Sequence, residues 1–334
     1  MILVIQSVFE PRGPAAKILA DLGAPVIIAL CIVTLIMLAL IVWVALRHRG
    51  TLDEHAPADA AGGQSWILIG GFAIPAVILA TIFIATLSTM NAFPVHDGKH
   101  PHPPDIIVTG HQWWWEVEYV GEAVCAPGSP DGHAFAPVDQ RMTTANEIHI
   151  PVGLPVEISL KSGDVIHSFW VPQLHGKVDL VPGQDNRIRI VASQPGEYRG
   201  QCAEFCGEQH AHMILHVFAD TPEAFRAWMT AQQAPARAAM TPQQKQGEDL
   251  FMTRACVVCH TIRGTPAFGK VGPDLTHIAS RGTIAAGSYP NTKAYLMAWI
   301  THAQSLKPGA QMPDLTIFNG DDLHAVTAYL MNLK

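Results

Sequence analysis

Two long apolar segments constrain this chain more than any other feature of its sequence. Residues 24–46 and residues 66–90 contain no charged side chain over 23 and 25 residues. Each segment exceeds the roughly 20 apolar residues that a helix needs to cross a bilayer. The first is also too long for the apolar core of a cleavable signal peptide, which runs about 7–15 residues. The sequence therefore predicts a transmembrane helical hairpin within residues 1–95, in which Pro75 is tolerated and can kink the second helix.

Positive charges beside the first span predict the orientation of the hairpin. Arg47 and Arg49 directly follow this span, and the positive-inside rule places such residues in the cytoplasm. Both chain termini, and everything that follows Met90, are then expected on the outer face of the membrane.

The segment after the hairpin has the pattern of an all-β domain. Short runs of β-branched and aromatic residues alternate with glycine, proline, aspartate and asparagine, which is typical of strands joined by turns. This pattern predicts a sandwich or Greek-key barrel. We assign it to residues 96–230, which begin with a Pro/His-rich connector at residues 96–104. The expected strands are residues 105–109, 113–119, 147–150, 156–160, 165–171, 187–191 and 213–218.

The C-terminal part is expected to be helical. Residues 231–243 (AQQAPARAAMTPQ) have the composition of a linker. Residues 244–334 then form a small all-α domain. Its first and last helices are expected at residues 244–255 and 321–332, with Asn319 or Asp321 as the N-cap of the last helix.

Charge is distributed unevenly along the chain. The whole chain carries 21 Lys+Arg and 28 Asp+Glu, a formal net charge of −7, which argues against a nucleic-acid-binding protein. Residues 97–230 hold 8 basic and 17 acidic residues, a net of −9, whereas residues 241–334 hold 8 and 6, a net of +2. The acidic domain can steer a basic redox partner, dock against the chain's own basic domain, or simply present a solvated face.

Four of the six cysteines form two close pairs, whereas Cys31 lies in the first span and Cys125 in a Pro/Gly-rich loop. One pair, Cys256 and Cys259, is followed by His260, and a C-x-x-C-H run is typical of covalent haem c attachment. Two thiols one helical turn apart can bond the two vinyl groups, and the histidine can ligate the iron. No βαβ pattern supports a thioredoxin-like motif, and no second ligand pair supports zinc.

Met312 is the expected second axial ligand of this haem. It lies in the loop KPGAQMPD (residues 307–314), where Pro313 restricts the backbone. Ligation by His and Met raises the haem potential, as suits a donor to an oxidising chain. Met297 falls in an apolar helical run and is expected in the core. The alternatives that would give a bis-histidine haem are His277, His302 and His324.

The second cysteine pair lies in a segment rich in soft metal ligands. Residues 200–213 read GQCAEFCGEQHAHM. Thiolate, imidazole and thioether donors suit copper rather than calcium or magnesium. Two cysteines can bridge two copper ions, and His167 then supplies a second histidine. A disulfide is the alternative in an exported domain, but it leaves the other donors unexplained. The candidate ligands within the segment are Cys202, Cys206, His210 and Met213.

These motifs resemble subunit II of cytochrome c oxidase, the family that carries the binuclear copper A centre. The resemblance rests on residues 167–183 (HSFWVPQLHGKVDLVPG), residues 200–213 and the aromatic run at residues 110–119 (GHQWWWEVEY). It extends over roughly residues 5–220 and implies a cupredoxin-like Greek-key barrel for the β domain.

The resemblance implies a role for each candidate residue. The Glu204 carboxylate would bind Mg2+ at the interface with subunit I. Trp113 would be the residue through which electrons reach copper A, whereas Trp114 and Trp115 are expected in the barrel core or at the membrane interface. The implied copper ligands are Cys202 and Cys206 bridging both ions, His167 and Met213 on one copper, and His210 with the Glu204 main-chain carbonyl on the other.

A fused haem domain is a known variation of this family, and the chain resembles subunit II of caa3-type oxidases, with a class I cytochrome c domain at residues 244–334. In such cytochromes a proline carbonyl, here that of Pro273, accepts the N–H of the haem-ligating histidine. Gly63 stands where several relatives carry a glutamate proposed as a proton-channel entrance. The resemblance therefore does not imply such an entrance in this chain.

The resemblance implies an electron-transfer function in a bacterial inner membrane. A donor such as cytochrome c or an upstream cytochrome bc complex would reduce haem c, and electrons would pass through copper A to subunit I for oxygen reduction and proton pumping. Subunits I and III and the lipid bilayer are the implied partners, and no nucleic acid is expected.

Other function classes fit parts of the sequence. Nitric oxide reductases can use the same copper A module, and nitrous oxide reductases carry it in a soluble enzyme, which the membrane hairpin disfavours. A membrane-tethered electron carrier or a copper-storage protein is a further alternative, although a closed ligand set beside a haem argues against storage. Quinol-oxidase subunits II lack the copper ligands that this chain has.

Overall fold

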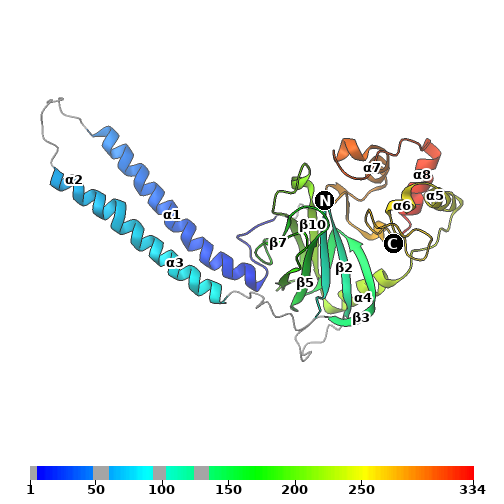
Figure 1. The fold of residues 1–334 in the computed structure, drawn as a ribbon, viewed down its shortest axis with the longest axis horizontal. Helices are drawn as coiled ribbons and strands as arrows, with labels where there is room; N and C mark the ends of the chain where they lie inside the picture. Colours follow the sequence, from blue (N-terminus) through cyan, green and yellow to red (C-terminus); the bar gives the residue numbers. More distant parts are fainter. Residues whose placement is uncertain (1–5, 48–59, 93–102, 124–134) are drawn as a thin grey trace. The chain divides into compact units, whose positions relative to one another are not determined.

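The computed structural model describes residues 6–47, 60–92, 103–123 and 135–334. It divides into two units, one made of Lys17–Pro94 and the other of Met1–Ala16 together with Val95–Lys334 (Figure 1). The predictions for Arg49, for Cys125 and for most of the 96–104 connector lie outside the described residues.

The first unit consists of two long apolar helical segments, as predicted. Pro14–Leu46 and Gly63–Asn91 are long and apolar enough to cross a membrane. The second contains a π-helical stretch immediately before Pro75. The proline ring clashes with the carbonyl four residues earlier in a regular helix, and a wider turn relieves that clash. The elements are α1 (Pro14–Leu46), α2 (Ala60–Trp66), η1 (Ile67–Ala73) and α3 (Ile74–Ala92).

The residues that precede the membrane helix pack on the β domain. The backbone N–H of Arg12 donates to the Gln173 carbonyl at 2.7 Å, and that of Ser193 donates to the Arg12 carbonyl at 2.7 Å. A Cβ on Gly13 would lie 2.5 Å from the Val191 carbonyl oxygen, so only glycine permits this approach. The residues around Arg12 and Gly13 are therefore held against the β domain.

The β domain is a sandwich of two sheets built from the described strands. The strands of the β domain are seen in Figure 1. One sheet has the order β3-β2-β1-β5-β8 and the other β4-β10-β9-β6-β7. Side chains that alternate inward along these strands form one core, which includes Trp115, Tyr119 and Phe169. The strands are β1 (Ile106–His111), β2 (Trp114–Ala123), β3 (Phe135–Ala145), β4 (Glu147–Pro151), β5 (Val156–Ser162), β6 (His167–Trp170), β7 (Val178–Leu180), β8 (Asn186–Ile190), β9 (Gly196–Cys202) and β10 (Ile214–Asp220).

The predicted all-β architecture is confirmed, and the structure adds elements that the sequence pattern did not reveal. Strands β3, β7 and β9 were not expected. Helix α4 (Pro222–Gln233) also follows the last strand. The Thr221 side chain caps α4 by accepting from the Ala224 N–H. Phe225 and Met229 of α4 are buried in the sandwich core.

The C-terminal domain is helical, as predicted. Its first and last long helices, α5 and α8, pack closely because Gly247 lies against the Ala325 carbonyl, 2.0 Å from where a Cβ would stand. Asn319 is the N-cap of α8 and accepts from the Asp322 N–H. The elements are α5 (Pro242–Thr253), α6 (Cys256–Cys259), η3 (Ile278–Ser280), β11 (Thr283–Ile284), β12 (Tyr289–Pro290), α7 (Lys293–Leu306) and α8 (Gly320–Leu330).

The segment expected to be a linker is held by hydrogen bonds. Residues 231–233 belong to α4, and α5 begins at Pro242. Between them, the Ala236 N–H donates to the Arg263 carbonyl at 3.1 Å, and Asn332 Nδ2 donates to the Ala238 carbonyl at 3.0 Å. The segment therefore follows the surface of the helical domain.

Candidate copper and haem sites

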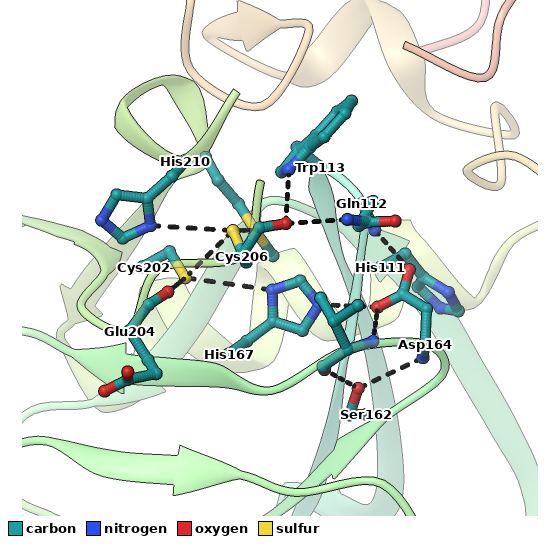
Figure 2. A network of polar contacts seen from close by, with 12 residues as sticks. His111, Gln112, Trp113, Ser162, Asp164, His167, Cys202, Glu204, Cys206 and His210 are labelled. Atoms are coloured by element: carbon teal, nitrogen blue, oxygen red, sulfur yellow. Dashed lines mark hydrogen bonds and ion pairs between the residues drawn. The ribbon is translucent and has the colours of Figure 1, made fainter. Parts of the chain in front are cut away.

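The candidate copper ligands converge at one end of the sandwich (Figure 2). His167 begins β6, and Cys202 ends the neighbouring strand β9, where Phe169 pairs with Cys202. The remaining ligands lie in the loop that follows β9. Pairing of β6 with β9 is therefore what brings a histidine to the cysteine segment from 35 residues away along the chain.

The donor atoms of these residues form a compact, buried set. Cys202 and Cys206 are free cysteines whose Sγ atoms are 3.6 Å apart. His167 Nδ1 lies 3.9 Å from Cys202 Sγ, and His210 Nδ1 lies 3.7 Å from Cys206 Sγ. The other two predicted donors also belong to this set: Met213 Sδ lies 3.9 Å from the Cys206 sulfur, and the Glu204 carbonyl oxygen lies 3.2 Å from the Cys202 sulfur.

The electrostatics of the set favour a metal-binding thiolate. The hydrogen bond between the Cys202 and Cys206 sulfurs, together with His167 and two backbone contacts, lowers the pKa of Cys202 to about 3 against the effect of burial. Burial alone would lower the pKa of His167, but its hydrogen bonds and charge interactions with Cys202 and Asp164 raise it overall. Two sulfurs, two imidazoles, a thioether and a carbonyl at these separations are the soft donor set that copper requires.

Asp164 and Gln112 complete the site, and the sequence analysis assigned no role to either. Asp164 Oδ1 lies 2.7 Å from His167 Nε2, which leaves Nδ1 facing the sulfurs. Its other oxygen accepts from the Gln112 N–H at 2.6 Å, and Gln112 Nε2 donates to the Cys206 carbonyl at 2.8 Å (Figure 2). A carboxylate that orients a ligating histidine is a common outer partner of metal sites. The only signal in the sequence was its place three residues before the histidine.

Trp113 connects this site with the helical domain. Its indole N–H donates to the Cys206 carbonyl at 3.0 Å (Figure 2), and its own carbonyl accepts from Lys307 Nζ at 2.9 Å. The two tryptophans that follow differ from it. Trp115 is fully buried in the sandwich core, whereas Trp114 stacks on His111 with ring centroids 4.7 Å apart.

The candidate haem residues line an apolar cavity of about 210 Å³, most of whose wall belongs to the helical domain. Cys256 and Cys259 come from the single turn of α6, and His260 follows directly. His260 Nδ1 lies 2.8 Å from the Pro273 carbonyl oxygen, as predicted. Burial lowers the pKa of His260, which favours the neutral imidazole. Because the Pro273 carbonyl faces Nδ1, it favours a proton on that nitrogen and leaves Nε2 available as an iron ligand.

Met312 is the one predicted axial-ligand candidate among the residues that line this cavity. Its loop is held by Gln304, whose Nε2 donates to the carbonyls of Ala310 and Met312 at 2.5 and 2.7 Å. His277 instead lies 3.0 Å from the Ala234 carbonyl through Nε2. A Cβ on Gly272 would stand 2.6 Å from the His260 ring, so this glycine lets the loop pass close to the imidazole. Two thiols, an imidazole and a thioether around an apolar cavity fit a covalent haem.

The same cavity is lined by residues of the sandwich. Gln112, Trp113, Trp114 and Asn146 contribute to its wall together with the cysteines and histidine of the haem motif. Trp113 therefore contacts the copper-ligand loop and also borders the candidate haem cavity.

Comparison with known proteins gives the family. Residues 105–219 match the family described as "Cytochrome C oxidase subunit II, periplasmic domain", and residues 244–334 match the family described as "Cytochrome c". Over 329 residues the chain is 31% identical to cytochrome c oxidase subunit 2 of Alkalihalophilus pseudofirmus, an alignment covering 97% of this chain and 90% of the relative. The chain belongs to the cytochrome c oxidase subunit 2 family. It carries a fused cytochrome c domain and is part of an oxidoreductase complex.

Other relatives cover different parts of this subunit 2. Cytochrome c oxidase subunit 2 of Bacillus subtilis is 26% identical and aligns with 98% of this chain and 92% of its own length. Quinol oxidase subunit 2 of Bacillus cereus is also 26% identical, over 69% of this chain and 74% of its own length. The crystal structure of the periplasmic domain of cytochrome oxidase subunit II from Bradyrhizobium japonicum is 26% identical, with a TM-score of 0.31 and coverage of 40% and 96%.

The two matches assign copper A to the sandwich and haem c to the helical domain of this subunit 2. The match to a periplasmic domain, together with the two apolar helices, makes the protein membrane-anchored with both domains outside.

Proposed function

We propose that this chain receives electrons for a caa3-type cytochrome c oxidase, taking them from a donor at its haem c and delivering them by way of copper A to subunit I for oxygen reduction coupled to proton pumping. The observation that carries the proposal is the place of Trp113. Its indole donates to the Cys206 carbonyl, and its ring borders the cavity that holds Cys256, Cys259, His260 and Met312.

The sandwich residues would hold copper A in one geometry. Cys202 and Cys206 would bridge the two ions. Asp164 would hold the His167 imidazole in one orientation, and it also accepts a hydrogen bond from the Gln112 backbone N–H. The sulfurs and His167 are buried, so water is excluded. The ligands that would complete the two coppers are His167 with Met213 and His210 with the Glu204 carbonyl.

The helical domain would hold the haem by covalent attachment and by two iron ligands. Cys256 and Cys259 would attach it covalently, and His260 and Met312 would ligate the iron. Pro273 would keep His260 in one tautomer and orientation through its carbonyl. When bound, copper A and haem c each supply a centre that takes up and releases one electron.

Further partners are proposed by the same reasoning. The Glu204 carboxylate is half-exposed and lies 3.8 Å from Lys177 Nζ, so it is accessible for Mg2+ at a contact with subunit I. We propose subunits I and III as partners, a cytochrome c or an upstream bc complex as donor, and the bacterial inner membrane as the location. The domain limits proposed from the sequence are 1–95, 96–230, 231–243 and 244–334.

Oxygen uptake by the captured complex tests this function. The complex is isolated through this chain in mild detergent and supplied with reduced cytochrome c. Oxygen consumption that cyanide blocks is the expected result. If haem and copper are present but oxygen is not consumed, the proposal fails, and adding nitric oxide then distinguishes a nitric oxide reductase from an electron carrier without a catalytic partner.

A further inference from the structure

The helical domain packs directly against the face of the sandwich that carries Trp113. The Ile214 N–H donates to the Ala286 carbonyl at 3.1 Å, and Gln209 Nε2 donates to the Pro308 carbonyl at 2.8 Å. We call this contact the domain interface. It includes residues 112–113, 146–147 and 208–216 of the sandwich and residues 281–288 and 307–310 of the helical domain.

Lys307 lies at the centre of the domain interface with only 3% of its surface exposed. Its Nζ donates to the carbonyls of Trp113 at 2.9 Å, His212 at 2.8 Å and Ala285 at 2.9 Å. An ammonium has three protons and no acceptor, so these three carbonyls satisfy it completely. A buried ammonium is costly without such partners. Because two of the three carbonyls belong to the sandwich, this arrangement exists only while the domains are in contact.

A second cation of the helical domain is buried at the same interface. Arg281 is 9% exposed and Glu147 of the sandwich 7% exposed. Burial raises the pKa of Glu147, and the charge of Arg281 opposes that rise. Glu147 Oε1 also accepts from the Gly282 N–H at 2.8 Å. The domain interface therefore buries an acidic side chain of the sandwich and a basic side chain of the helical domain.

The loop that begins at Lys307 leads directly to the candidate axial ligand. Gly309 has φ +79°, and a Cβ there would stand 3.3 Å from the Trp113 ring. Met312 follows three residues later. Holding Lys307 on the Trp113 carbonyl thus positions the indole and the Met312 loop with respect to each other.

We propose that Lys307 is a positioning residue that locks the cytochrome c domain onto the copper A domain, so that the two cofactor pockets keep one relative position with Trp113 between them. It acts through the carbonyls of Trp113 and His212, to which its Nζ donates. The expected consequence is that transfer between the domains needs no diffusional encounter and is insensitive to salt. The lock rests on contacts of the chain itself, and only this consequence depends on the proposed function.

Hydrogen exchange on the assembled complex, read by mass spectrometry, tests the lock. Lys307→Met keeps the side-chain length but leaves three carbonyls without a donor, so peptides covering residues 208–216 and 281–288 should exchange about ten- to a hundredfold faster. Lys307→Gln retains two N–H donors and should give an intermediate rate. Lys245→Met, at an exposed lysine on α5, is the matched control and should exchange like the wild type.

Two results would overturn the proposal. Wild-type peptides that exchange as unprotected chain would show that the domains are not docked, and unchanged protection in Lys307→Met and Lys307→Gln would show that Lys307 is not the lock. Copper content, expected to be unchanged, separates loss of the lock from damage to the copper site. If Lys307→Met fails to assemble, the exchange rates of the same peptides in Lys307→Gln decide whether Lys307 is the lock.

A second readout separates positioning from general stability. Electron transfer from haem to copper A in the wild type should be independent of ionic strength, because screening acts weakly on buried groups. In Lys307→Met it should slow as salt rises, because the separated domains must then meet through screened surface charge. Salt-independent transfer in that variant would contradict the lock. If oxygen uptake is not observed, the proposed function fails, but the hydrogen-exchange result still decides whether Lys307 holds the two domains together.

Discussion

The copper site and the haem site of this chain are built in different ways. The candidate copper donors lie on adjacent strands and one short loop of a β-sandwich, and each of their sulfur and nitrogen atoms lies within 4 Å of another donor atom. The haem donors line a cavity, and Met312 comes from a loop outside any helix or strand, more than 50 residues after His260.

This difference indicates what holds each site together. The copper set is organised by strand pairing and by Asp164, so the protein imposes its geometry before the metal binds. The candidate haem cavity is lined mostly by apolar groups, so a covalently attached haem would complete that core. Changes at the copper site should therefore act on metal binding, whereas changes around the haem should act on potential and domain stability.

Removing one of the two proposed bridging sulfurs should have the largest effect. In Cys206→Ser the hydroxyl cannot replace a bridging thiolate, so copper affinity should fall by more than about 100-fold, beyond the range of outer-partner substitutions. Copper per chain, measured on the purified complex, should drop while the haem c band is retained. Cys31→Ser, at an exposed cysteine of α1, is the control. Full copper retention in Cys206→Ser would remove the bridging role.

Changing Met312, the proposed axial ligand, should alter the haem without affecting the copper. Met312→His should keep the covalent haem but lower its potential by at least about 0.1 V, well inside the roughly 0.8 V over which axial ligands tune haem. A redox titration of the haem band measures this. Met297→Leu, outside the cavity-lining set, should leave the potential unchanged. An unchanged potential in Met312→His would assign the ligand elsewhere.

Weakening the partner of His167 tests how far the sandwich preorganises copper A. Asp164→Asn removes the charge that orients the imidazole but keeps an oxygen for the Gln112 N–H. Copper affinity should fall about 10- to 100-fold, with a haem potential equal to that of the wild type. Competition with a copper chelator measures the change. Affinity within twofold of the wild type would mean that strand pairing alone orients His167.

The helix contact in the cytochrome c domain gives the smallest expected effect. Gly247→Ala would place a Cβ 2.0 Å from the Ala325 carbonyl oxygen, and such overpacking costs about 1–3 kcal/mol. Thermal unfolding followed at the haem band should shift down, with the copper signal unaffected. Gly320→Ala, where a Cβ meets nothing within 4 Å, is the matched control. Equal melting of the two variants would show that α5 and α8 can separate freely.

Local chemistry was readable from the sequence because it depends on spacing. Haem attachment at Cys256, Cys259 and His260 needs only one helical turn, and residues 200–213 carry soft donors that few structures other than a copper site explain. The uncharged lengths of the two spans similarly reflect bilayer thickness. Strand β9 was missed because Gly196, Gly200 and charged residues interrupt its alternation, although it carries Cys202.

The tertiary structure alone decided which distant residues meet. Lys307 follows an ordinary helix and is expected on the surface, because lysine is almost never fully buried unless paired. Its acceptors are backbone carbonyls, which have no side-chain signature, and two of them lie about 95 and 194 residues away. The candidate copper and haem ligands could therefore be predicted from the sequence. The placement of Trp113 between the copper site and the haem cavity depended on how the cores of the two domains pack against each other.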